Sequence, residues 1–310
     1  MIRYIIKRLL VLIPMLLAIA FIIFAIMSMT PGEPAQLILG LRATPESLAQ
    51  LSKEMGFDKP FLIRYFDYVI NAAQGDLGIS WRSSRPVFDE IITRFPTTIK
   101  LAGLGILIAL LIGVPLGILA SVKQYSIFDI IGTSTAMLMA SLPSFWIGLM
   151  SILLFALYLR IMPSHGIDTW KHYVLPSITM ALPVAANLLR LTRATMLETI
   201  RQDYISTARA KGQSEKLVIF RHALPNALLP VITVAGTQFC GMLGGVVTVE
   251  AVFSINGVGM LILESIRMKD IPLVTGCTLF LAASVMVMML IVDILYAYID
   301  PRIRALYIKR

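Results

Sequence analysis

Residues 101–122, LAGLGILIALLIGVPLGILASV, form an unbroken apolar run without a single charged side chain. About 20 apolar residues in a helix are enough to cross the hydrocarbon core of a bilayer. Five more charge-free runs lie on either side of this one, and we therefore predict six membrane-spanning helices. The six runs are 9–29, 101–122, 130–159, 173–189, 223–249 and 271–292.

The composition agrees with a membrane protein. Of the 310 residues, 57% are hydrophobic and 15% are charged, whereas a soluble domain carries about 25% charged residues. The predicted fold class is therefore an all-α membrane protein with six transmembrane helices. Prolines bear on the shape of two spans in particular. Pro176 and Pro183 make the fourth the least regular, and Pro225 and Pro230 predict that the fifth helix begins near Val231.

Basic residues predict the direction of the spans. Arg3, Lys7 and Arg8 precede the first run, and loops rich in Lys and Arg stay in the cytoplasm, so both termini are expected there. The segments predicted to lie inside carry 15 Lys and Arg against five Asp and Glu. Membrane orientation and lipid headgroups explain the net charge of +9, and no nucleic-acid partner is expected. A signal peptide cleaved after Ala20 is disfavoured, because the apolar run continues to Met27.

The runs divide the chain into four parts. Residues 1–29 hold the N-terminus and the first span, 30–98 form an outer segment, 99–300 form a five-helix core, and 301–310 form a tail. In the outer segment, Thr44-Pro45-Glu46 predicts a capped helix with Pro at its first position. Two interpretations of this segment stay open: a lid over the outer mouth, or a docking surface for an extracytoplasmic partner.

The core contains one long inner loop, residues 190–222. Its centre, DYISTARAKG at 203–212, predicts a short helix that Asp203 caps and Gly212 ends. Tyr204, Ala208 and Lys211 are spaced i, i+4, i+7 and share a face, on which the small Ala allows another protein's backbone to come close. The alternative, a helix lying on lipid, is disfavoured by the scarcity of large apolar residues.

This loop resembles the cytoplasmic coupling loop of binding-protein-dependent ABC importer permeases. Thr207-Ala208-Arg209 stands where the usual loop has Glu-Ala-Ala, with the spacing to Gly212 kept. Other stretches resemble the B-type subunit of the peptide/nickel branch, and the resemblance covers nearly the whole chain. They include MTPGEPA at 29–35, GDLGIS at 75–80, SLPSFWIG at 141–148, GGVVTVEAVF at 244–253 and VDILYAYIDPRIR at 292–304.

The resemblance implies a type I ABC importer permease in a bacterial cytoplasmic membrane. The implied partners are a second homologous permease, two ABC ATPase subunits, an extracytoplasmic solute-binding protein and membrane lipid. This chain has no G-x-x-x-x-G-K-[ST] loop, so it is expected to be non-catalytic and without a cofactor, with ATP and Mg bound by the ATPases. The implied ATPase-coupling residues are Asp203, Tyr204, Thr207, Ala208, Ala210, Lys211 and Gly212.

The branch transports several substrates. Di- and oligopeptides are the first choice because they are its broadest use, and nickel chelates and glutathione remain open. A secondary transporter, the alternative from another class, needs mid-membrane ionisable groups and an inverted repeat, and neither is evident. An intramembrane enzyme is disfavoured because no paired nucleophile and base is evident within the spans.

Further candidates come from positions near or within the spans. Glu250 lies at the outer end of the fifth span and is an outer-gate candidate, with Asn256, Gly257 and Gly259 expected in the turn after it. Ile255-Asn256-Gly257 departs from the aromatic-Pro-Gly sequence common in relatives. Asn187 and Gln238 are pore candidates because they are polar residues within spans.

Two further expectations concern the glycines within the spans and the residues that could bind a metal. Gly113-x-x-x-Gly117 and Gly241-x-x-x-Gly245 each place glycines on one helix face, where a second helix can pack closely. No metal site is expected, because the three histidines are scattered and Cys240 and Cys277 lie within spans as buried apolar residues.

Overall fold

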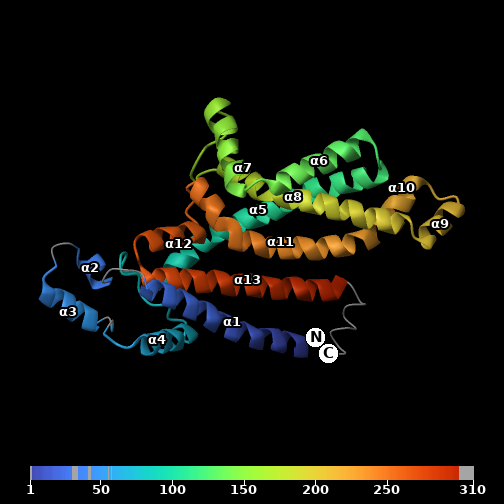
Figure 1. Cartoon of the computed structure of the whole chain (residues 1–310). Coiled ribbons are helices and arrows are strands. Elements are labelled where there is room, and N and C mark those ends of the chain that lie inside the picture. The colour runs from blue at the N-terminus through green and yellow to red at the C-terminus, as the bar shows by residue number, and fades with distance from the viewer. Residues whose placement is uncertain (1, 30–33, 41–42, 55, 57, 300–310) are drawn as a thin grey trace. The chain divides into compact units, whose positions relative to one another are not determined.

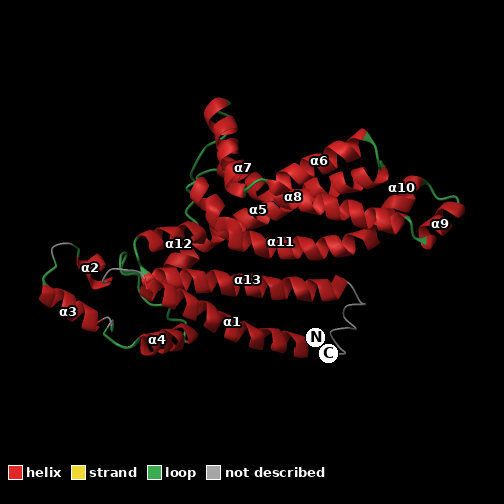
Figure 2. Cartoon of the chain, in the orientation of Figure 1, coloured by secondary structure: helices red, strands yellow, loops and turns green. Residues whose placement is uncertain are grey.

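The computed structural model describes residues 2–29, 34–40, 43–54, 56 and 58–299. All named elements in these ranges are helices (Figures 1 and 2), and the isolated bridge between Ile79 and Pro86 is the one β-pairing found there. The chain separates into two compact units, one of residues 99–255 with 287–299 and one of residues 2–98 with 256–286. The fold is therefore all-helical throughout the described residues.

The first unit is built around one long buried helix, α8. Residues that line its core face are fully buried, among them Leu188 and Met196. Helices α6, α7 and α11 pack against α8, and α9, α10 and η2 follow its C-terminal end. The elements of this unit are the later part of α5 (Val87–Val122), α6 (Ile127–Ser141), α7 (Ser144–Ser151), η1 (Ile152–Tyr158), α8 (Lys171–Ile200), α9 (Asp203–Ala210), α10 (Glu215–Leu217), η2 (Val218–Ala223), α11 (Leu224–Val252) and the end of α13 (Ile271–Ile299).

The second unit joins the N-terminal helices to the beginning of α13. Its elements are α1 (Ile2–Met29), α2 (Pro34–Leu39), α3 (Pro45–Glu54), α4 (Phe61–Ala73), the first turns of α5, α12 (Val258–Arg267) and the first half of α13. Val87, Ile91 and Val258 are fully buried in its core. Asp270, just before α13, accepts hydrogen bonds from Ser80 Oγ at 2.6 Å and from the Leu273 amide at 3.2 Å. This carboxylate therefore ties the loop before α5 to the start of α13.

The outer segment, residues 30–98, contains the capped helix predicted within it. Helix α3 begins at Pro45, and the Ser47 amide donates to Thr44 Oγ1 at 3.3 Å, which confirms the predicted cap. The structure adds α4, whose aromatic side chains pack on α1. Tyr65 Oη donates to the carbonyl oxygen of Leu17 at 2.9 Å. Because α4 also contacts Phe21 and Phe24, it lies alongside the C-terminal half of the first apolar run.

Within the described residues, five helices are long and apolar enough to cross a membrane, and they lie in α1, α5, α8, residues 215–252 and α13. The predicted span over 130–159 consists of two helical pieces, because α6 and the α7–η1 pair meet at a bend of 104°. Pro143 explains the break: it cannot donate a helical hydrogen bond, and it holds Leu142 in an extended conformation. The third span is therefore either a broken helix or a re-entrant pair.

The prolines of the fourth and fifth spans act differently from the expectation. Helix α8 continues through Pro176 and Pro183 and extends past the predicted end of its span to Ile200. Helix α11 begins at Leu224, so the predicted start near Val231 was wrong. Pro225 lies in its first turn, where a missing amide hydrogen leaves no helical bond unmade, and α11 continues through Pro230.

The two glycine pairs differ in how closely other residues pack against them. A Cβ atom placed on Gly113 would lie 2.6 Å from the carbonyl oxygen of Ala185, and one on Gly117 would lie 2.6 Å from Cβ of Thr192. The predicted close packing at Gly113 and Gly117 is thus confirmed, between α5 and α8. A Cβ on Gly241 or Gly245 would meet nothing within 4 Å among the described residues. This second glycine face is not packed inside the described chain.

Candidate functional site

The predicted short helix of the inner loop exists as α9. It begins one residue after Gln202, so Asp203 is not its cap; Gln202 takes the capping position without a side-chain hydrogen bond. Asp203 is instead the first helical residue, where a carboxylate is favoured by the helix dipole. Gly212 has a φ of +78° and its amide donates to the Arg209 carbonyl at 2.9 Å, so it ends the helix as predicted.

One side of α9 packs onto the rest of its unit. Ile205 and Ala208 are buried in a cluster with Met196 and Val218. The face expected from the i, i+4, i+7 spacing is therefore divided: Tyr204 and Lys211 are exposed, whereas Ala208 is only 6% exposed. Ala208 thus holds α9 close to α8 and η2, and the surface offered to another protein comes from its neighbours. The exposed α9 residues are Asp203, Tyr204, Ser206, Thr207, Arg209 and Ala210.

Polar contacts fix the turn that follows α9. Arg209 donates from Nη2 and Nε to the carboxylate of Glu215, at 2.6 and 3.1 Å. These bonds raise the pKa of the Arg209 guanidinium above its ordinary value. His222 Nε2 lies 2.6 Å from Oε1 of Gln213, which connects the same turn to η2. The two contacts hold α9 as a defined hairpin with the start of the fifth span.

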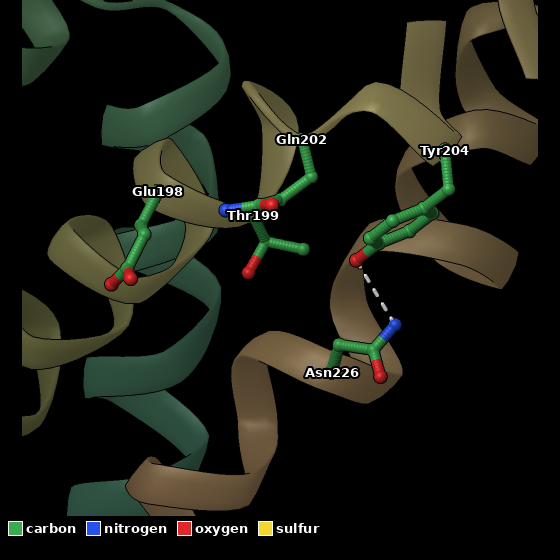
Figure 3. A pocket seen from close by; sticks show the side chains of 5 residues that line it. All are labelled: Glu198, Thr199, Gln202, Tyr204 and Asn226. Carbon is green, nitrogen blue, oxygen red and sulfur yellow. Dashed lines mark hydrogen bonds between the residues drawn. The ribbon is translucent and has the colours of Figure 1, made fainter. Parts of the chain in front are cut away.

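A polar pocket of about 520 Å³ lies beside this hairpin. Figure 3 shows its lining, in which the Asn226 amide donates to Tyr204 Oη at 3.1 Å. Thr199 and Gln202 lie between this pair and Glu198, whose carboxylate is exposed. The pocket therefore joins the end of α8, the start of α9 and the first turn of α11. A concave polar surface of this kind can receive a polar side chain of another protein.

A buried ion pair joins α6 to α8 in the same unit. Arg193 donates from Nε to Oδ1 of Asp129 at 2.6 Å and from Nη2 to Oδ2 at 2.8 Å. The carboxylate also accepts the Tyr125 amide at 2.9 Å, and Asp129 is only 3% exposed. The sequence reasoning missed this pair, because the two residues are 64 positions apart and no local pattern connects them.

The outer-gate candidates do not all lie where they were expected. Glu250 is fully buried in the last turn of α11. Asn256 is exposed in the turn after α11, and Gly257 is the capping residue of α12. Gly259 lies inside α12, so its placement in the turn was wrong. The helix begins at Val258, whose amide donates to Thr98 Oγ1 at 3.0 Å.

The two pore candidates differ in exposure. Asn187 is exposed although it lies in the middle of α8, the most buried span, with buried residues on either side of it. Gln238 on α11 is half-buried.

Cys240 and Cys277 are buried as free thiols. Among the described residues, His, Cys, Asp and Glu side chains form no group of three that could hold a metal ion.

Comparisons with known proteins cover almost the entire chain. The family described as binding-protein-dependent transport system inner membrane component matches residues 113–305, and the N-terminal family of such membrane components matches residues 1–102. The glutathione transport system permease protein GsiC of Escherichia coli strain K12 is 40% identical over 304 residues, covering 98% of this chain and 99% of the relative. GsiC of Salmonella choleraesuis strain SC-B67 is 39% identical over the same length and coverage.

Two solved structures share the fold. An inward-facing structure of the MetNI methionine ABC transporter has a TM-score of 0.57 at 16% identity and covers 67% of this chain and 95% of its own. A crystal structure of an amino acid ABC transporter with histidines has a TM-score of 0.53 at 16% identity and covers 69% and 94%. These likenesses confirm the predicted fold class, that of type I ABC importer permeases.

Proposed function

This chain belongs to the family of binding-protein-dependent transport system inner membrane components, and we propose that it imports short peptides. The match to GsiC over 98% of the chain makes it an ABC importer permease of the glutathione and peptide/nickel branch. As such it is a multi-pass membrane subunit of a transporter. The membership carries the proposal, because it covers both the permease core and the N-terminal segment.

The substrate proposal has three candidates, of which the first two belong to one chemical class. Di- and oligopeptides are the first candidate. Glutathione is itself a modified tripeptide, and the name of relatives 40% identical to this chain favours it as the second candidate. Nickel chelates are the third. Uptake of labelled dipeptide, tripeptide, glutathione and nickel is compared in a deletion strain with and without this chain. Restored peptide uptake supports the first candidate, and restored nickel uptake alone contradicts it.

Energy is proposed to come from two partner ATPases that bind ATP and Mg, with a second permease and a solute-binding protein completing the importer. No nucleotide loop of this chain contributes. Helix α9 is proposed as the coupling helix, because it is short, held by buried Ile205 and Ala208, and exposed on the other side. Closure of an ATPase can then move α8 and α11 through one rigid hairpin.

The exposed side of α9 provides the coupling test. Ala210→Trp adds a bulky side chain at an exposed α9 position, and it is expected to lower uptake and substrate-stimulated ATP hydrolysis of the assembled importer. Leu217→Trp, at an exposed position of α10, is the matched control and keeps both activities. Unchanged uptake by the Ala210 variant contradicts the assignment. Ala208 is unsuitable for this purpose, because replacing it disturbs the buried cluster as well.

The orientation is proposed from the basic residues, with both termini and α9 in the cytoplasm. Both native cysteines are buried, so a single introduced thiol reports the topology. Lys211→Cys is exposed and is expected to react with a membrane-impermeant maleimide in inside-out vesicles and not in right-side-out vesicles. Reaction of this cysteine in right-side-out vesicles alone contradicts the proposed orientation and places α9 on the outer side.

Asn187 and Gln238 are proposed to line the pathway, and Glu250, Asn256, Gly257 and Gly259 to belong to the outer gate. Asn187 carries the stronger argument, because an exposed amide in the middle of a buried span avoids lipid only where it faces a partner or water. Asn187→Leu is expected to change the Km for uptake, while Thr237→Val, an exposed polar position of α11, serves as control. An unchanged Km removes Asn187 from the pathway.

A further inference from the structure

The unit of residues 2–98 and 256–286 contains an apolar cavity that transport does not explain. Its volume is about 440 Å³, within the range of roughly 300–1,000 Å³ typical of small-molecule sites. Its walls come from α1, α4, the loop before α5, the first turn of α5, and α13. The lining residues are Ile13, Leu16, Leu17, Ala20, Tyr68, Val69, Ala72, Ala73, Gly75, Leu77, Phe88, Leu279, Phe280 and Ala283.

Tyr68 has the one polar side chain in this lining. Its Oη is buried and has no hydrogen-bond partner among the described residues. Burial raises the pKa of Tyr68, so the hydroxyl remains a protonated donor. An unpaired buried hydroxyl has lost its hydrogen bonds to water, and a ligand carrying a hydrogen-bond acceptor can restore one of them. The cavity therefore fits a long apolar group that ends in an acceptor.

A cationic side chain lies one helical turn from that hydroxyl. Arg64 precedes Tyr68 by four residues on α4, so both project from the same face. The guanidinium carbon of Arg64 lies 5.8 Å from the ring centroid of Phe24, and the Tyr68 ring lies 5.9 Å from the same centroid. Nε of Arg64 is also buried without a hydrogen-bond partner in the described part of the chain. A guanidinium in such a position suits an anionic oxygen, such as that of a phosphate.

The surroundings of the cavity are those of a bilayer. The α1 residues that line it fall in the middle of a span, and Ile13 and Leu17 of this lining remain exposed. Helix α4 also exposes an apolar stripe, Leu62, Phe66 and Ile70, at i, i+4, i+8 spacing. Surfaces of this kind at the depth of a spanning helix meet hydrocarbon, so the cavity is continuous with a lipid-facing surface.

We propose that this cavity binds one phospholipid of the outer leaflet. One acyl chain fills the apolar cavity, Tyr68 Oη donates to an ester carbonyl of the lipid, and the Arg64 guanidinium pairs with its phosphate. Along α4, Arg64, Tyr68 and the cavity follow one another in the order of phosphate, ester and acyl chain in a phospholipid. The bound lipid seals the space between α1, α4 and α13 and fixes the outer segment on its span.

The binding test uses the assembled importer, purified in mild detergent and studied by native mass spectrometry with added phosphatidylglycerol. Tyr68→Phe is expected to weaken retention of one lipid about fivefold, and Arg64→Gln about tenfold or more, from the loss of a neutral and of a charged hydrogen bond. Tyr158→Phe and Arg85→Gln change exposed residues outside the cavity and leave retention unchanged. Equal retention by both members of each pair overturns the proposal.

A second measurement maps the acyl chain directly in the unmodified protein. Phosphatidylglycerol with a photoreactive acyl chain is expected to label residues 68–73 and 279–283. Ala72→Trp, which fills the cavity, removes this labelling, while Leu62→Trp on the exposed stripe keeps it. Wild-type labelling confined to other segments overturns the proposal, as does a crosslink from these residues to the second permease in place of lipid. A glycolipid without phosphate that binds equally well overturns the role of Arg64.

Discussion

The packing of α5 on α8 supports a quantitative prediction. A Cβ on Gly113 would lie 2.6 Å from the Ala185 carbonyl oxygen, 0.8 Å closer than the 3.4 Å at which ordinary contact begins. Because that oxygen belongs to the backbone, α5 and α8 must separate or distort. Overpacking of this kind costs about 1–3 kcal/mol. Gly113→Ala is therefore expected to destabilise the permease even though Ala favours helix formation.

Gly103 provides the matched control in the same helix. A Cβ at Gly103 meets nothing within 4 Å among the described residues. Both substitutions gain up to about 1 kcal/mol of helix propensity, so this gain cancels in the comparison. The difference in unfolding free energy between Gly113→Ala and Gly103→Ala then isolates the clash, at about 1–3 kcal/mol. We expect the melting temperature of the Gly113 variant to be lower by roughly 2–10 °C.

Thermal unfolding of the purified complex in detergent, followed by intrinsic fluorescence, measures this difference. Gly117→Ala, with a Cβ 2.6 Å from Thr192 Cβ, should behave as Gly113→Ala does. The double variant tests whether the two glycines form one contact, because coupled sites are not additive. Melting temperatures of the Gly113 and Gly103 variants that agree within error refute the reasoning.

Three further predictions concern other contacts. Asp129→Asn removes the charge that pairs with Arg193, and it should cost about 1.5–3 kcal/mol of stability in the same unfolding assay; no loss means that the pair is not formed. Gly212→Val forces a β-branched residue to a φ of +78°, and it should lower uptake more than Gly132→Val does, since equal losses point to general damage. The raised pKa of Tyr68 favours the protonated form in the folded state, so stability is lost only as pH rises above the ordinary value of 10.0. The tyrosinate absorbance of the wild type and of Tyr68→Phe should therefore coincide below that pH.

Much of the candidate site followed from local patterns. The helix at 203–212 was predicted from its alanines and from Gly212, and both α9 and its end are confirmed. Its cap was predicted wrongly, because Gln202 precedes Asp203 in the extended conformation that a cap requires. The inward face of Ala208 was also not predictable, since helical spacing places residues on a common face without saying which surface that face meets.

Contacts between distant segments lay beyond the sequence reasoning. The Asp129–Arg193 pair and the glycine contact of α5 depend on which helices become neighbours. The two glycine pairs have the same spacing, yet only Gly113 and Gly117 meet another helix within the described chain. The packing of α4 on α1 was likewise not predictable. The aromatic residues of α4 indicate that it has an apolar face, but they do not say which helix that face contacts.

The sequence alone determined that this chain is a helical membrane protein, because six long runs without charge have a stable form only as helices in a bilayer. It also determined the family, whose stretches are spread along the whole chain. The tertiary structure decided where the third run breaks, which side of α9 is buried, and how α1, α4 and α13 enclose a cavity. Hydrophobicity and helix formation are properties of neighbouring residues, whereas packing joins residues that the sequence holds far apart.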